Sequence, residues 1–129
     1  MTLSITPLYA GLIALFFVYL SFRVIKVRRG ARISLGDGGG SDMAYRIRAQ
    51  ANLAEYAPIG LILLALAELQ GAPVWVLHFL GLTLLVGRLM HGWAFSQRPQ
   101  NLKARIYGMM LTLGMITFTA VANIGHALF

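Results

Sequence analysis

The 129-residue chain contains no cysteine and only four acidic side chains, against eleven lysines and arginines. The absence of cysteine excludes disulfide bonds, thiol nucleophiles and zinc–thiolate sites, so any thiol chemistry needs a thiol from a substrate. Charged residues make up 12% of the chain and hydrophobic residues 58%, whereas soluble domains average about 25% charged residues. This composition indicates that lipid surrounds most of the chain.

The basic residues are concentrated in two blocks, at residues 23–48 and 98–105, and Arg88 alone lies outside them. Basic blocks separated by apolar segments are typical of the cytoplasmic loops of a membrane protein. No basic run is interleaved with aromatic residues in the way that nucleic-acid platforms require. The net charge of +7 therefore does not predict a nucleic-acid partner.

Four apolar segments are long enough to cross a bilayer of roughly 30 Å as helices. We expect spans at about residues 3–22, 44–70, 73–95 and 105–128. The first is interpreted as a retained span and not a cleaved signal peptide, because the positive charge follows its apolar run. Short connections predict an all-α, up-and-down four-helix bundle, with residues 1–129 as a single transmembrane domain.

The distribution of charge also predicts the orientation of the chain. The first and third connections are basic and the second has no lysine or arginine, so the termini should face outside and the first and third loops the cytoplasm. We expect an integral membrane protein in contact with membrane lipid, and its compact loops favour a bacterial inner membrane. Four short spans bury little surface, which favours self-association.

A polar stripe opens the second span. Arg48, Asn52 and Glu55 lie within about 40° of one another on a helix, and Tyr56 lies about 80° round. Ionisable groups at this depth are costly and need partners or a function. Two interpretations stay open: a ligand site in which Arg48 holds a carboxylate, or an Arg48–Glu55 ion pair that sets helix registry. Gln50 points the opposite way and should face another helix.

A second polar stripe follows the fourth span, and contains Arg105, Met109, Thr112, Thr119 and Asn123. Such a stripe should face protein, so we expect interhelical hydrogen bonds from the two threonines and the asparagine. Arg105 lies at the cytoplasmic end. It is positioned either to stabilise an anion there or to extend toward the lipid headgroups.

The remaining ionisable residues give weaker signals. Arg88 and His91 are three residues apart on the third span. His78, His91 and His126 are too far apart in sequence to form a local metal box, so no metal is expected. Glu68, at the outer end of the second span, is most simply interpreted as a solvated end residue.

The segment Arg48-Ala-Gln-Ala-Asn-Leu-Ala-Glu-Tyr-Ala-Pro58 resembles the signature of the MAPEG family (membrane-associated proteins in eicosanoid and glutathione metabolism). The family pattern is Arg-x-Gln-x-Asn-x-x-Glu-x-x-Pro, and every fixed position is met. Arg88-Leu-Met-His91, and Arg105 with Gly108, also look like family positions. The resemblance covers nearly the whole chain and implies a bacterial-type member: a four-helix membrane bundle that forms homotrimers.

The resemblance further implies that glutathione binds as co-substrate between neighbouring subunits, at the cytoplasmic side. By position, its binding residues would be Arg48, Asn52, Glu55, Tyr56 and His91. Arg105 would be catalytic and stabilise the thiolate. The expected function is that of a membrane-bound transferase or peroxidase, active in detoxification of small apolar electrophiles or lipid hydroperoxides.

Two positions depart from some active members of the family. Phe95 and Met109 stand where those members carry tyrosines, which removes two hydroxyl donors. An alternative therefore stays open, in which the chain is a non-catalytic membrane scaffold or lipid-binding protein. A channel or transporter ranks last, because the polar groups of the second span stop near Glu55.

Overall fold

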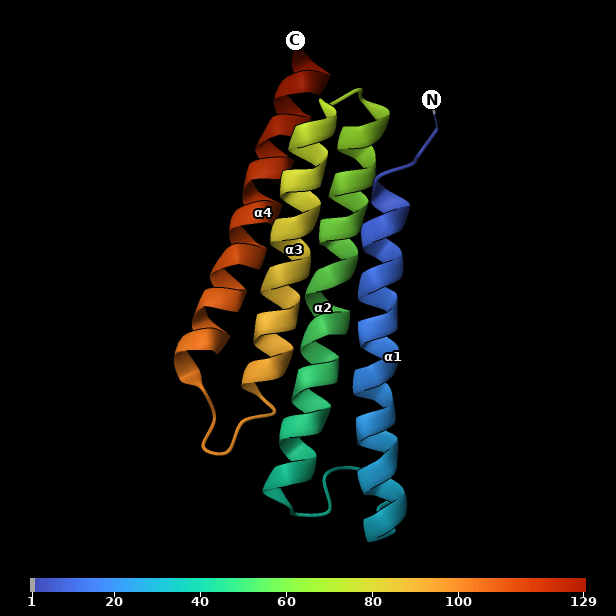
Figure 1. Ribbon diagram of the computed structural model, residues 1–129, viewed down its shortest axis with the longest axis vertical. Helices are drawn as coiled ribbons and strands as arrows, with labels where there is room; N and C mark the ends of the chain where they lie inside the picture. Colours follow the sequence, from blue (N-terminus) through green and yellow to red (C-terminus); the bar gives the residue numbers. More distant parts are fainter. Residues whose placement is uncertain (1) are drawn as a thin grey trace.

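The computed structural model describes residues 2–129, which form four α-helices in up-and-down order (Figure 1). The helices are α1 (Thr6–Ala31), α2 (Ser41–Leu69), α3 (Val74–Ala94) and α4 (Leu102–Leu128). Each is long and apolar enough to cross a membrane. The all-α four-helix membrane bundle expected from the sequence is confirmed.

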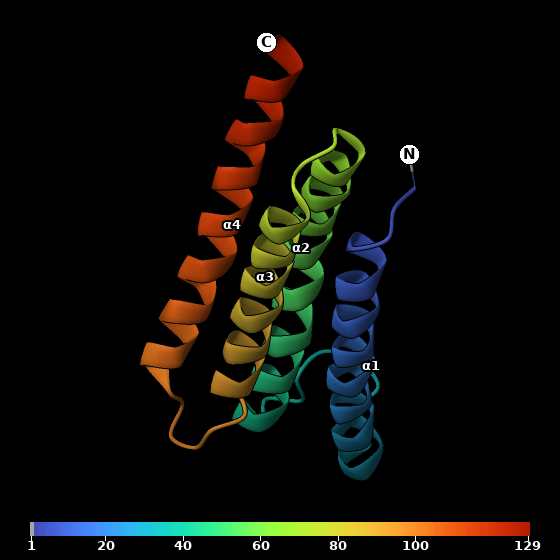
Figure 2. The ribbon, with the colours of Figure 1, turned by 45° about the horizontal axis from the view of Figure 1, so that its top comes forward.

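The two central helices, α2 and α3, hold the bundle together. Each packs against the other three helices, whereas α1 and α4 make no contact with each other in the part of the chain described. Figures 1 and 2 show α1 and α4 on opposite flanks, with both chain ends and the α2–α3 connection at one end of the bundle. The first and third connections lie at the other end, which we call the basic end because both basic blocks lie there.

Helix α1 continues well past the expected end of its span, so the first part of the predicted first loop, residues 23–31, is helical. The helix ends only at Ala31, and Arg32 adopts a left-handed conformation with φ of 55°. Lysine and arginine are good helix formers. Arg28 and Arg29 lie in the last turn, where positive charge favours the negative end of the helix dipole. The connection that remains spans residues 32–40.

Helices α3 and α4 approach most closely where two glycines face each other. A Cβ atom on Gly108 would lie 2.7 Å from the carbonyl oxygen of Gly87 and 2.8 Å from the backbone nitrogen of His91. Because those neighbours are backbone atoms, they cannot turn aside as a side chain can. Small residues allow such close packing of helices in a membrane.

Glu68 is not the solvated end residue that the sequence suggested, and that interpretation was wrong. Its Oε1 accepts the backbone N–H groups of Ser4 at 2.7 Å and Ile5 at 2.8 Å, and its Oε2 accepts that of Thr6 at 2.7 Å. The first N–H groups of a helix have no partner within the helix. Glu68 supplies them with acceptors and places a negative charge at the positive end of α1.

The interhelical hydrogen bonds follow the sequence expectation in part. Gln50 donates to the hydroxyl of Ser21 on α1 at 3.2 Å, and so faces another helix as expected. Asn123 donates to the carbonyl oxygen of Leu63 on α2 at 3.0 Å. Thr119 was expected to bond between helices, but its hydroxyl donates to a carbonyl one turn earlier in α4, at 2.7 Å. Short threonine side chains readily make this local bond.

We expect Glu68→Ala to lower the stability of the bundle by roughly 1–2 kcal/mol, because three N–H groups lose their acceptor and the helix dipole its counter-charge. Thermal unfolding of the purified protein in neutral detergent would measure the change. Glu68→Gln keeps one acceptor oxygen and should give an intermediate result. An unchanged unfolding midpoint in Glu68→Ala would contradict the capping role.

We expect Gly108→Ala to destabilise the protein by about 1–3 kcal/mol, since the added methyl group meets two backbone atoms. Gly114→Ala is the matched control on the same helix, because a Cβ there would have no atom within 4 Å. The control should be neutral or slightly stabilising, since alanine favours helices by roughly 1 kcal/mol over glycine. Equal unfolding midpoints for the two variants would show that the glycine contact is not tight.

Candidate functional site

Arg88, on α3, is a charged side chain buried between three helices and is only 1% exposed. Its Nε donates to the hydroxyl of Thr112 on α4 at 2.8 Å. Its Nη1 donates to Oδ1 of Asn52 on α2 at 2.5 Å. Arg88 therefore joins α2, α3 and α4 through polar contacts, in the half of the bundle nearer the basic end.

The remaining contacts of Arg88 are weaker. Its Nη2 lies 3.7 Å from the sulfur of Met109, and its Cζ lies 5.6 Å from the ring centre of Tyr56. Within residues 2–129, no carboxylate forms an ion pair with Arg88. A buried cation is costly unless it is paired or well hydrogen-bonded. Two neutral oxygens, one sulfur and an aromatic face take the place of a counter-ion here.

The contact with Arg88 also fixes the orientation of the Asn52 side chain. A guanidinium has only N–H donors, so the Asn52 atom that faces it must be the carbonyl oxygen. The amide nitrogen of Asn52 is then directed elsewhere, and it donates to no other group among the residues described. Asn52, which is buried at 7% exposure, can therefore offer an N–H donor to a ligand.

Arg48 and Glu55 form an ion pair on the same face of α2. The nearer nitrogen and oxygen are 3.3 Å apart, and the two side chains are 54% and 50% exposed. This is the pairing that the sequence left open as one of two interpretations. Exposed ion pairs contribute at most about 1 kcal/mol, so a ligand with its own charges can replace this pair at little cost.

Phe95 connects two of the other predicted site residues. Its buried ring lies 5.0 Å from the ring of His91, centre to centre. The guanidinium carbon of Arg105 lies 4.7 Å from the centre of the same ring. Arg105 is exposed and also donates to Oε1 of Gln100 at 3.4 Å. Cation–π contact and a weak hydrogen bond thus hold Arg105 at the start of α4.

The predicted site residues fall into three groups in one copy of the chain. Asn52 and Tyr56 surround Arg88, Arg48 pairs with Glu55, and His91 and Arg105 contact Phe95. No hydrogen bond or ion pair among residues 2–129 joins Arg105 to the α2 stripe. No cluster of side chains that could hold a metal ion occurs in that range either.

Sequence reasoning placed Arg88 beside His91 but missed its link to Asn52 and Thr112. The Arg88–Asn52 contact joins residues 36 positions apart on different helices, and helical periodicity carries no information about such a pairing. The available signal was a charged residue inside an otherwise apolar span, which usually faces protein and has a partner.

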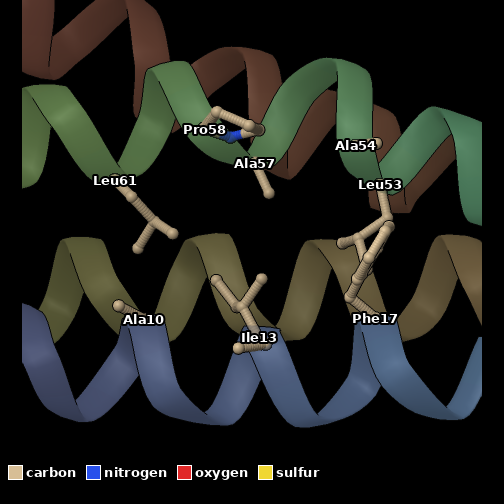
Figure 3. Close-up of a pocket in the computed structure, with 9 residues that line it drawn as sticks. Ala10, Ile13, Phe17, Leu53, Ala54, Ala57, Pro58 and Leu61 are labelled. Carbon is tan, nitrogen blue, oxygen red and sulfur yellow. The ribbon is translucent and has the colours of Figure 1, made fainter.

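An apolar groove of about 260 Å³ lies on another side of α2, against α1 (Figure 3). In Figure 3, Leu53, Ala57 and Leu61 point toward Ile13 and Phe17 of α1. The groove offers contact area for hydrocarbon. Its lining contains no side chain that could bind a charged group or activate a thiol.

We expect Asn52→Leu to destabilise the bundle by about 1–3 kcal/mol, because Arg88 would lose a buried acceptor. Asn52→Asp should keep or raise the stability, since a carboxylate of nearly the same shape would pair with the buried guanidinium. Thermal unfolding of both variants beside the unmodified protein measures this. If Asn52→Asp were the less stable of the two, the Arg88–Asn52 contact would be misassigned.

Comparison with known proteins agrees with this architecture. The model of the MAPEG family matches residues 6–125. The chain is 38% identical over 122 residues to the inner membrane protein YecN of Escherichia coli, in strain K12 and in strain O6:H1. The alignment covers 95% of this chain and 92% of YecN. With the four apolar helices, this similarity supports an integral inner-membrane location. The chain belongs to the MAPEG family.

Proposed function

We propose that the protein is a membrane-bound glutathione-dependent enzyme, a transferase or peroxidase that acts on apolar electrophiles or lipid hydroperoxides. The observation that carries the proposal is the polar face of α2. It combines an N–H donor on Asn52 with an exchangeable ion pair between Arg48 and Glu55, beside the buried Arg88. A cation, an anion and a neutral donor on one helix face suit a small zwitterionic ligand.

The chemistry of glutathione matches these three groups. The tripeptide carries two carboxylates, one ammonium group and a thiol. Arg48 can bind a carboxylate through two parallel hydrogen bonds, Glu55 can bind the ammonium group, and Asn52 can donate to a carboxylate or peptide oxygen. Tyr56 contacts Arg88 and His91 contacts Phe95, and both are proposed to close the site around the peptide.

Arg105 is the proposed catalytic residue. A cation close to the sulfur lowers the pKa of the glutathione thiol and so raises the concentration of the nucleophilic thiolate. Arg105 is exposed and is restrained by the ring of Phe95, and among the residues described its N–H groups make only the long 3.4 Å hydrogen bond to Gln100. It can therefore turn its donors toward an approaching sulfur.

The two reactions share the thiolate as nucleophile. In the transferase reaction, sulfur attacks an electrophilic carbon, a carbon–sulfur bond forms, and the leaving group departs with the electron pair. In the peroxidase reaction, sulfur attacks a peroxide oxygen and the oxygen–oxygen bond breaks, which releases an alcohol. A second glutathione then converts the oxidised sulfur to glutathione disulfide and water.

The assembly proposed for this reaction is a homotrimer, with the first and third loops on the cytoplasmic side and the termini outside. Two observations support it. Arg48 and Glu55 are half exposed on a helix that enters the membrane, and Arg105 meets neither of them within one copy. Polar side chains at membrane depth favour a protein neighbour over lipid. A second copy could bring its Arg105 to the α2 stripe of the first.

A second candidate function is a non-catalytic scaffold or lipid-binding member of the family. The positions of Phe95 and Met109 favour it, because both side chains are engaged by arginines and neither has a hydroxyl. This candidate predicts no turnover with any thiol, whatever the binding behaviour of the α2 face.

We expect glutathione to raise the unfolding midpoint of the purified protein. Arg48→Ala should lower the affinity for glutathione by roughly tenfold, because one charged contact is lost, and should therefore reduce that shift. Asn52→Asp should bind more weakly still, although it stays folded, because a carboxylate replaces the N–H donor and repels the ligand. Lys103→Ala removes a charge outside the site and should leave the shift unchanged.

The same proteins would then be assayed for conjugation of glutathione to 1-chloro-2,4-dinitrobenzene and for reduction of a lipid hydroperoxide. We expect Arg105→Ala to lower kcat by about a hundredfold while KM for glutathione changes little. Glutathione binding without turnover in the unmodified protein would favour the scaffold. If the unmodified protein showed no glutathione binding and no turnover, the proposed enzymatic function would be refuted.

A further inference from the structure

A polar cavity, which we call the basic cavity, lies between α1, the start of α2 and the connection after α3. Its volume is about 440 Å³, and its lining consists of Tyr19, Phe22, Arg23, Lys26, Arg46 and Ser96. None of these residues belongs to the proposed glutathione site. Arg46 and Arg48 lie about 200° apart on α2, so the two sites open on different sides of that helix.

The basic cavity has an excess of positive charge. Three cations line it and no carboxylate does. Asp42 pairs with Arg46, at 3.0 Å, but it also pairs with Arg98 at 2.9 Å. One carboxylate is thus shared between two guanidinium groups, and Arg23 and Lys26 form no ion pair among the residues described. The cavity is therefore suited to an anion.

The side chains of the cavity are arranged for an oxyanion. Arg23 donates to the hydroxyl of Ser96 and lies 5.9 Å from the ring centre of Tyr19. These contacts hold the guanidinium in place at the cavity wall. Guanidinium groups with N–H donors available bind phosphate bidentately, and the ammonium group of a lysine also binds phosphate.

The other side of the cavity is apolar and faces outward. Tyr19 and Phe22 are 57% and 64% exposed, and the stripe that they end continues along α1 through Leu8, Leu12 and Leu15, which are exposed as well. These five residues lie within about 40° of one line, at 100° per residue. Aromatic residues at the end of an apolar stripe are typical of the membrane interface.

We propose that the basic cavity binds the headgroup of an anionic phospholipid, whose acyl chains lie along the exposed stripe of α1. The positive charge selects a headgroup with a net negative charge, and the adjoining hydrocarbon surface selects a lipid over a soluble phosphate. The location agrees with the cytoplasmic leaflet, where anionic lipid gathers and basic pockets between membrane helices bind such headgroups.

Native mass spectrometry of the full chain, in neutral detergent and at roughly 0.15 M ionic strength, where distant charges are screened, tests this proposal. The protein would be titrated with phosphatidylglycerol, with phosphatidylcholine of the same acyl chains, and with inorganic phosphate. We expect phosphatidylglycerol to bind at least about tenfold more tightly than phosphatidylcholine. Inorganic phosphate should not compete at concentrations where the lipid saturates.

The double variant Arg23→Gln/Lys26→Gln should weaken phosphatidylglycerol binding roughly thirtyfold, because two positive charges near the headgroup are lost. The matched control is Arg29→Gln with Lys103→Gln, which removes the same charge outside the cavity and should leave the affinity within about twofold. Circular dichroism would establish that both variants remain helical.

Three outcomes would overturn the proposal. Equal weakening in the test and control variants would mean that the lipid senses only net charge. Effective competition by inorganic phosphate would assign the cavity to a soluble anion. If the substitutions of Arg23 and Lys26 changed the number of copies in the assembly, and the unmodified protein bound both lipids equally, the cavity would be a contact between copies of the chain.

Discussion

The bundle depends on a buried cation, Arg88, that has no carboxylate partner among residues 2–129. Arg88 donates to oxygens on α2 and on α4, and it is almost fully enclosed. In a membrane, helices gain little from hydrophobic attraction to one another, so polar contacts and close packing set their arrangement. The guanidinium links α3 to α2 and α4 beside the Gly87–Gly108 contact, where the α3 and α4 backbones meet. Together these two features determine the shape of the half of the bundle that carries the proposed site.

The same cation also fixes one of the polar groups on the α2 face, where a ligand is proposed to bind. Because Arg88 takes the carbonyl oxygen of Asn52, the amide can act only as a donor on its other side. Arg48 and Glu55, by contrast, form side-chain hydrogen bonds only with each other among residues 2–129. The site thus combines one rigid group with two that can exchange partners. Glutathione, the ligand proposed for this site, would use both kinds, because its peptide has to be oriented and its charges neutralised.

Helix α2 separates two regions of different chemistry at the basic end. One side carries an amide, a carboxylate and cations, and suits a zwitterionic peptide; the other carries cations without a lining carboxylate, beside an exposed apolar stripe. Gln50 lies on the second side, about 40° from Arg46, and bonds to α1, as its position on the helix predicted. The stripe of Arg48, Asn52 and Glu55 was also predictable from its spacing. Glu68 was not, because its partners are the backbone N–H groups of residues 4–6, which no side-chain pattern reveals.

Apolar length, the positions of the basic blocks and the spacing of polar residues along α2 determined the four spans, the bundle class and the candidate face from the sequence alone. Those signals are local, because helical periodicity and hydrophobic length can be followed along a single element. The tertiary structure decided which partner each polar group has: Asn52 with Arg88, Arg105 with the ring of Phe95, and Glu68 with the start of α1. These contacts join residues on different helices or in different segments. They follow from the packing of whole helices, which no single stretch of the chain specifies.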